Sequence, residues 1–203
     1  MESFKPISSD NLFEFLNFAS KLKELKRTGW IKSGIPNPES VADHSFRVAL
    51  LVLFFDPKEI NQEKAMKMGL IHDLGESIIG DITPFDGVTQ MEKKERESKA
   101  FEKIKETINN QLGQELFDLW LEFEEGKSPE AQLIQQLDKF EMIKTAFEYE
   151  IQSFKNSQKK LDPLESFFET TKGFFTNKLI QKWDQDLRKK REEFWKEKRK
   201  DQK

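Results

Sequence analysis

The segment Ile71-His72-Asp73-Leu74-Gly75-Glu76 (IHDLGE) places a histidine and an aspartate side by side within a largely apolar run. The chain of 203 residues contains only two histidines, and the other one, His44, also has an aspartate beside it, in VADHSF. An aspartate among GLIHDL would be costly to bury without a partner, because burial removes the carboxylate from water. The segment therefore indicates either two packing accidents or one site that uses both imidazoles.

Both histidines fall on the apolar face of a predicted helix. On a helix that begins at Pro38, the residues sharing a face at intervals of three and four are Val41, His44, Val48, Leu51 and Phe55. In the same way His72 shares a face with Ala65, Met68 and Gly69. Both imidazoles are expected to point inward. Spacing alone leaves open whether each is a hydrogen-bonded core residue or a metal ligand.

Helix-start signals recur along the chain, whereas we find no convincing alternating strand pattern and no strand–turn–strand signal. The predicted starts combine capping residues with a proline or an acid in the first turn: Asp10, Asn37-Pro38-Glu39, Thr89-Gln90-Met91-Glu92, Ser128-Pro129-Glu130 and Asp162-Pro163-Leu164-Glu165. The sequence predicts an all-α fold, a single-domain bundle of about six or seven helices. Its domain is expected to span residues 1–181, followed by a charged helical tail at 182–203.

Composition excludes several classes of protein. The net charge is −3, which argues against a nucleic-acid-binding face, and the absence of cysteine excludes disulfides, thiol nucleophiles and Cys-ligated metals. The N-terminus does not have the layout of a secretion signal, and the longest apolar run, at 48–55, is too short to span a bilayer. A cytoplasmic protein without membrane or nucleic-acid partners is expected. The tail is expected to be a solvated helix docked through Phe194 and Trp195, with a basic tail for an acidic partner as the alternative.

A third acidic position completes a possible ligand set. Asp138 lies on the predicted helix AQLIQQLDKFEMIKTAF, where it is either salt-bridged to a basic residue or a ligand. Neither Asp73 nor Asp138 has an evident basic partner in the sequence, so a cation would compensate both. Together His44, His72, Asp73 and Asp138 suit a divalent ion such as Mn²⁺, Co²⁺, Fe²⁺, Zn²⁺ or Mg²⁺. Five- or six-coordination would leave positions for water and a substrate oxygen.

The order of a histidine, then His-Asp, then a distant aspartate resembles the signature of the HD-domain metal-dependent phosphohydrolases. Three strings resemble the 5′-deoxynucleotidase branch of that family, the YfbR-like enzymes and their eukaryotic relatives: KRTGWIKSGIPNPESVADHSFRVA, GLIHDLGESIIGDITP and QLDKFEMIKTAFEYE. The resemblance extends from about Leu22 to Tyr149.

This resemblance implies an enzyme that removes the 5′-phosphate from deoxyribonucleoside 5′-monophosphates through a metal-activated water, commonly as a homodimer. It implies four metal ligands: His44, His72, Asp73 and Asp138. Arg27 matches a substrate-binding arginine, and Trp30 matches a tryptophan associated with the sugar. Thr28 and Gly29 stand between Arg27 and Trp30, as in the eukaryotic-like subgroup.

Glu76 and Asp81 match further site positions. If the helix persists past Gly75, Glu76 lies one turn beyond His72 and can exchange protons with water or with the leaving 5′-oxygen. Asp81 would orient the water or, with Glu76 and the carbonyl of Ile82, hold a second cation. The alternative is a surface carboxylate and a turn residue. With only two histidines, a second histidine-rich metal site is excluded.

Two other functions stay open at this stage. One is an HD phosphohydrolase that acts on another small phosphorylated metabolite, and the other is a non-catalytic nucleotide-binding protein or a scaffold with a structural metal. Trp30 also has two interpretations. Its indole either forms a wall where a 2′-hydroxyl would lie, or packs between the first two helices.

Overall fold

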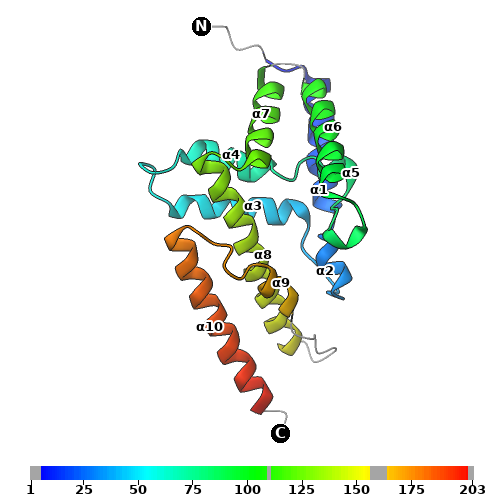
Figure 1. Ribbon diagram of the computed structural model, residues 1–203. Helices are drawn as coiled ribbons and strands as arrows, with labels where there is room; N and C mark the ends of the chain where they lie inside the picture. Colours follow the sequence, from blue (N-terminus) through cyan, green and yellow to red (C-terminus); the bar gives the residue numbers. More distant parts are fainter. Residues whose placement is uncertain (1–5, 109–110, 156–163, 201–203) are drawn as a thin grey trace. The chain divides into compact units, whose positions relative to one another are not determined.

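The computed structural model describes residues 6–108, 111–155 and 164–200, and its architecture is helical throughout these ranges (Figure 1). The helices are α1 (Ser9–Glu24), α2 (Thr28–Lys32), α3 (Val41–Leu51), α4 (Gln62–Ile71), α5 (Glu76–Ile79), α6 (Gln90–Ile108), α7 (Gln111–Glu125), α8 (Pro129–Lys155), α9 (Glu165–Thr170) and α10 (Lys178–Lys200), with short 3₁₀ turns η1 (Val52–Phe54) and η2 (Pro84–Asp86). Within these ranges the β structure consists of one isolated bridge, Lys26 with Ser40. The prediction of an all-α fold is confirmed.

More helices form than the six or seven expected, because three of them are short elements that hydrophobic spacing does not reveal: α2, α5 and α9. One break in the helical structure falls within the segment Ile71–Glu76. Helix α4 ends at Ile71, with His72 as its C-cap residue, a turn follows, and α5 begins at Glu76. The assumption that one helix continues past Gly75 is therefore wrong, and Glu76 is instead the first residue of a new helix.

Helix starts agree with the sequence where a side chain caps the first turn. Thr89 and Ser128 accept hydrogen bonds from Glu92 N and Ala131 N, as expected for α6 and α8. Two other starts were misplaced. Ser8 caps α1 in place of Asp10, and α3 begins at Val41 instead of Pro38.

Reciprocal capping sets the start of α3. Ser40 Oγ accepts from Asp43 N at 3.1 Å, while Asp43 Oδ2 accepts from Ser40 N at 2.8 Å. This capping box satisfies donors that a start at Pro38 would leave to water. The predicted start at Asp162-Pro163 lies outside the described residues.

The chain groups into two compact units, Met1–Ile134 and Gln135–Lys203, and the boundary falls within α8. The predicted division between 1–181 and 182–203 stays a prediction. None of the described helices combines the length and apolar composition needed to cross a bilayer.

In the first unit, α3 and α4 approach closely at Gly69. A Cβ atom at Gly69 would lie 3.1 Å from the Ala49 Cα atom, so a side chain there would force the two helices apart by a few tenths of an ångström. Val48 and Met68 are fully buried on either side of this contact. The close approach positions the two histidine-bearing elements next to each other.

The second unit is organised around a buried carboxylate on α8. Glu150 has no exposed surface and accepts from Arg191 Nε at 2.8 Å, Arg191 Nη2 at 2.9 Å, Trp195 Nε1 at 3.0 Å and Leu164 N at 2.7 Å. Phe194 adds an edge-to-face ring contact with Phe147. These contacts hold α10 along α8.

Candidate metal centre and phosphate site

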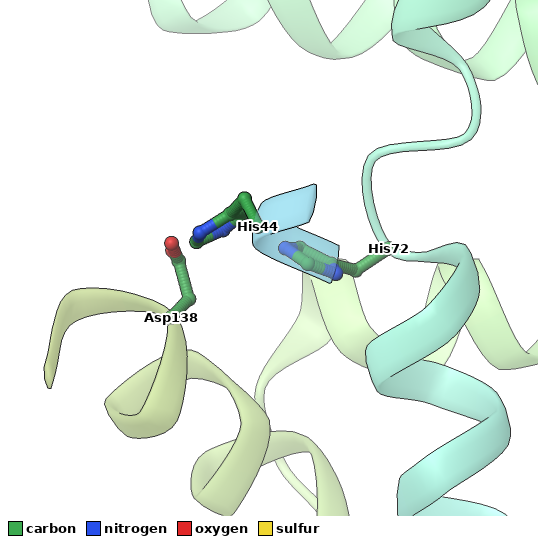
Figure 2. Close-up of side chains that lie close together, drawn as sticks. All are labelled: His44, His72 and Asp138. Atoms are coloured by element: carbon green, nitrogen blue, oxygen red, sulfur yellow. The ribbon is translucent and has the colours of Figure 1, made fainter. Parts of the chain in front are cut away.

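The two imidazoles lie together in the first unit. His44 on α3 is fully buried, His72 at the end of α4 is almost so, and their ring centroids are 5.5 Å apart in an edge-to-face arrangement (Figure 2). The Nδ1 atom of His72 is 2.8 Å from the carbonyl oxygen of Gly69. A carbonyl can only accept, so Nδ1 carries the proton and Nε2 keeps its lone pair for a ligand. The expected inward direction of both histidines is confirmed.

Asp73 brings a carboxylate to the same point. Its Oδ2 atom lies 3.3 Å from His72 Nε2 and 3.8 Å from His44 Nε2, and Arg27 Nη1 donates to the same oxygen at 3.2 Å. The expectation that Asp73 lacks a basic partner is therefore wrong. Arg27 is 46 residues away in the chain, which is why local sequence does not reveal the pair.

The donor set in the first unit fits a divalent ion of borderline character. Two imidazole nitrogens and one carboxylate oxygen converge, and this is a mixture that suits Mn²⁺, Fe²⁺, Co²⁺ or Zn²⁺. Asp138, also labelled in Figure 2, belongs to α8 in the second unit. Its Oδ2 atom accepts from Lys139 Nζ at 2.9 Å, so a basic partner is present here too.

Glu76 is a buried acid beside this centre. Burial raises the pKa of Glu76 well above its ordinary value of 4.5, the charges of Asp73 and Asp81 raise it further, and Arg27 and Lys93 oppose the shift. Its Oε2 atom is buried and has no hydrogen-bond partner among the described residues. Burial and nearby negative charge favour the protonated form of a carboxyl, which is the form that can donate a proton.

The segment that carries Arg27 is fastened to the loop that carries Asp81. Asp81 Oδ2 accepts from Thr28 N at 2.6 Å, and Lys32 Nζ donates to Asp86 Oδ1 at 2.6 Å. The Lys32 contact lowers the pKa of Asp86 to about 2, with help from hydrogen bonds to Thr83. Ile82 follows Asp81 in this loop. Asp81 is therefore held by a backbone N–H within the same unit as Asp73.

Trp30 is almost completely buried, with 1% of its surface exposed. Its indole N–H donates to Glu39 Oε1 at 2.9 Å, which fixes the orientation of the ring. Trp30 follows Arg27 by three residues. Arg27, the candidate for binding phosphate, is the N-cap residue of α2, and the indole of Trp30 belongs to the same short helix.

Three charged residues that sequence reasoning missed lie on α6 and α7. Lys93 and Glu97 form a pair, with Lys93 Nζ 3.4 Å from Glu97 Oε1, and Glu124 acts on Glu97 by its charge. Burial raises the pKa of Glu97 to about 7, Lys93 opposes the shift, and Glu124 and Asp73 add to it. The signal available in the sequence was that Lys93 and Glu97 are spaced by helical turns from the buried Ala100 and so share its face. Helix α6 is so rich in charged residues that this face could not be told from a solvated one.

Replacing Glu97 with glutamine should stabilise the metal-free protein at pH 8 and change its stability little at pH 5. The folded-state pKa of about 7 lies above the ordinary 4.5, so this group's contribution is fully present below pH 4.5 and is lost as the pH rises through 7. At about 1.4 kcal/mol for each pKa unit, the expected gain at pH 8 is at most about 3 kcal/mol. Thermal melts at both pH values measure it.

Glu95→Gln is the matched control, because Glu95 lies on the exposed face of α6 and pairs with Lys99 at 2.6 Å. That contact lowers the pKa of Glu95, so its removal should give no gain at pH 8. A gain from Glu97→Gln that is equal at pH 5 and pH 8 would show that packing, and not ionisation, is responsible.

Comparisons with known proteins agree with this geometry. The HD domain family profile matches residues 19–183. The chain is 44% identical to the 5′-deoxynucleotidase HDDC2 of Dictyostelium discoideum over 84% of this chain and 93% of that protein. It is 39% identical to the 5′-deoxynucleotidase hdd1 of Schizosaccharomyces pombe over 91% of this chain and 92% of that protein.

A solved structure is similar as well. A conserved hypothetical protein from Pyrococcus furiosus superimposes with a TM-score of 0.70 at 33% sequence identity, covering 87% of this chain and 99% of that one. A helical fold with a His and His-Asp centre defines a class of metal-dependent phosphohydrolases, and the profile match covers most of the chain. The chain belongs to the HD-domain family.

Proposed function

We propose that this protein is a metal-dependent 5′-deoxynucleotidase, which hydrolyses deoxyribonucleoside 5′-monophosphates to deoxynucleosides and phosphate. The observation that carries the proposal is the convergence of His44, His72 and Arg27 on one oxygen of Asp73. It combines ligands for a cation with a guanidinium suited to a phosphate. The relatives named as 5′-deoxynucleotidases support the choice of substrate.

We propose His44, His72, Asp73 and Asp138 as the ligands of the ion. A bound divalent ion supplies a water of lowered pKa and polarises a phosphoryl oxygen. The match of Asp138 to the family's last aspartate and the two histidines that neighbour each other support this set. Glu76, Asp81 and the carbonyl of Ile82 are proposed as an all-oxygen site for a second cation.

The protein's own residues then perform distinct tasks. Arg27 binds the phosphate while it stays close to Asp73, so the substrate's charge is countered as it enters. Glu76 is the proposed proton donor to the leaving 5′-oxygen, because burial and the neighbouring acids raise its pKa. Asp81 holds Thr28 and through it the Arg27 segment.

Phosphate release from a panel of monophosphates tests this proposal. The panel contains dAMP, dGMP, dCMP and dTMP, the four ribonucleotides, a 3′-deoxynucleotide and sugar phosphates, each with defined divalent ions. Hydrolysis of the 5′-deoxynucleotides above all others supports the function. Preference for a sugar phosphate or another metabolite would show that the protein is an HD phosphohydrolase with a different substrate. If no phosphate is released with any ion, the proposal that the protein is an enzyme is refuted.

Trp30 is our proposed determinant of the deoxyribose preference. Replacement by phenylalanine removes the bond to Glu39 and part of the indole wall, and should admit AMP better, which narrows the ratio of kcat/KM between dAMP and AMP. Steric exclusion of one hydroxyl accounts for about 10- to 200-fold at most. Thermal melts are measured together with kinetics because Trp30 is buried. Equal losses on both substrates would assign Trp30 to the core.

We also propose a cytoplasmic homodimer. Four large apolar side chains are exposed along α3 and the turn that follows it: Phe46, Leu50, Leu53 and Phe54. A patch of this kind is typical of a surface that another chain covers. Light scattering of Phe54→Glu against the unchanged protein distinguishes a dimer from a monomer.

A further inference from the structure

Helix α6 directs two charged side chains toward the site. Lys93 and Glu97 share a stripe with three buried apolar residues at intervals of three and four: Ala100, Phe101 and Ile104. Phe101 lies against the site segment, because a Cβ atom at Gly75 would be 3.2 Å from its ring. In Figure 1 this helix runs beside α5, with which it packs. The Lys93 face of α6 therefore borders the segment that carries Asp73 and Glu76.

The charge of Lys93 acts on the acids of the site. Burial lowers the pKa of Lys93, but the carboxylates of Glu97, Asp73 and Glu76 outweigh this effect and leave the pKa raised. Its side chain is 32% exposed, so Lys93 is partly accessible from solvent. Lys93 is thus a fully charged cation at the edge of an acidic site.

A phosphate dianion needs such a cation. The carboxylate of Asp73 would repel the substrate, and Arg27 already donates to Asp73. Arg27 and Lys93 are the cations whose charges oppose the raised pKa of Glu76, so both lie near this acid. A lysine ammonium binds phosphate as a point charge, while arginine adds directed hydrogen bonds.

We propose that Lys93 is a second phosphate-binding residue of this site and acts together with Arg27. The inference rests on the proposed function, because it assigns a further contact to the same substrate. It differs from the usual role of a lysine–glutamate pair one helical turn apart, which is to stabilise a solvated helix weakly.

The chain provides a matched control for that ordinary role. Lys99 and Glu95 form a second pair on α6 at 2.6 Å, and their side chains are 71% and 64% exposed. Lys99→Gln therefore removes a helical ion pair of the same kind on the face that points away from the site. It should leave activity and phosphate binding unchanged.

The test compares Lys93→Gln, Lys93→Arg and Lys99→Gln with the unchanged protein. For each we would measure kcat and KM for dAMP, the inhibition constant of inorganic phosphate, metal content and thermal stability. Lys93→Gln should raise both KM and the phosphate inhibition constant by about 10- to 100-fold, the range expected when one hydrogen bond to a charged group is lost. Metal content should not change, and Lys93→Arg should restore part of the binding.

Several results would overturn the inference. An unchanged phosphate inhibition constant in Lys93→Gln excludes a contact with phosphate, even if kcat falls. Equal effects of Lys93→Gln and Lys99→Gln would assign Lys93 to helix stability, as would a loss of binding that follows a fall in melting temperature. If the unchanged protein releases no phosphate from dAMP, the proposed function fails instead. In that case phosphate binding by calorimetry still decides the role of Lys93.

Discussion

His72→Ala should abolish both metal binding and phosphate release. His72 supplies a nitrogen 3.3 Å from Asp73, and alanine leaves no ligand at that position. Removing residues that only support a ligand reduces metal affinity about 10- to 100-fold, so loss of a ligand should exceed about 100-fold. Elemental analysis of the purified variant measures the ion, and phosphate release from dAMP measures turnover.

Chelation of the unchanged protein should reproduce the variant. Activity and melting temperature should both fall and return when Mn²⁺ or Co²⁺ is added, because the ion stabilises the folded state that binds it. Lys67→Gln is a suitable control for His72→Ala. Lys67 lies on α4, the helix that ends just before His72, and it pairs with Glu115 at the surface. Full activity after verified removal of all metal would exclude the proposed mechanism.

Glu76→Gln should lower kcat about 10²- to 10⁴-fold while the protein keeps its ion. Glutamine has nearly the same shape as glutamate but cannot donate a carboxyl proton, and it fits the same buried position. Steady-state kinetics with dAMP and metal analysis of the same sample provide the measurement. Loss of the ion together with kcat would make Glu76 a ligand.

The variant Asp81→Asn distinguishes the role of Asp81 from that of Glu76. Asparagine can still accept the hydrogen bond from Thr28 N, so the loop should stay in place while the negative charge disappears. We expect a smaller loss of kcat than for Glu76→Gln. The opposite order would transfer the proton-donating role to Asp81.

Helical periodicity predicted the part of the site that depends on one helix at a time. His44 and His72 were expected on the apolar faces of their helices, and both are buried. The all-α class followed from capping and proline signals, two of which, at Thr89 and Ser128, coincide with observed helix starts. In both cases the decisive interactions lie within a few residues of one another.

Features that depend on distant parts of the chain could not be predicted in this way. The pairing of Arg27 with Asp73 requires α2 to pack near the end of α4, and no local pattern contains that information. The turn between α4 and α5 lies against Phe101 of α6 at Gly75, a contact that no local pattern contains. Lys93 was overlooked for the same reason, because its surroundings come from another helix.

The buried carboxylate of Glu150 gives the last part of the sequence an importance that its composition conceals. A nonsense mutation or a proteolytic cut just before Arg191 would remove both Arg191 and Trp195 and leave Glu150 on α8. Breaking a buried ion pair from one side costs about 3–5 kcal/mol, a large share of the stability of an ordinary domain. We expect such a shortened chain to be unstable and therefore degraded. An expression vector should retain the residues from Arg191 onward.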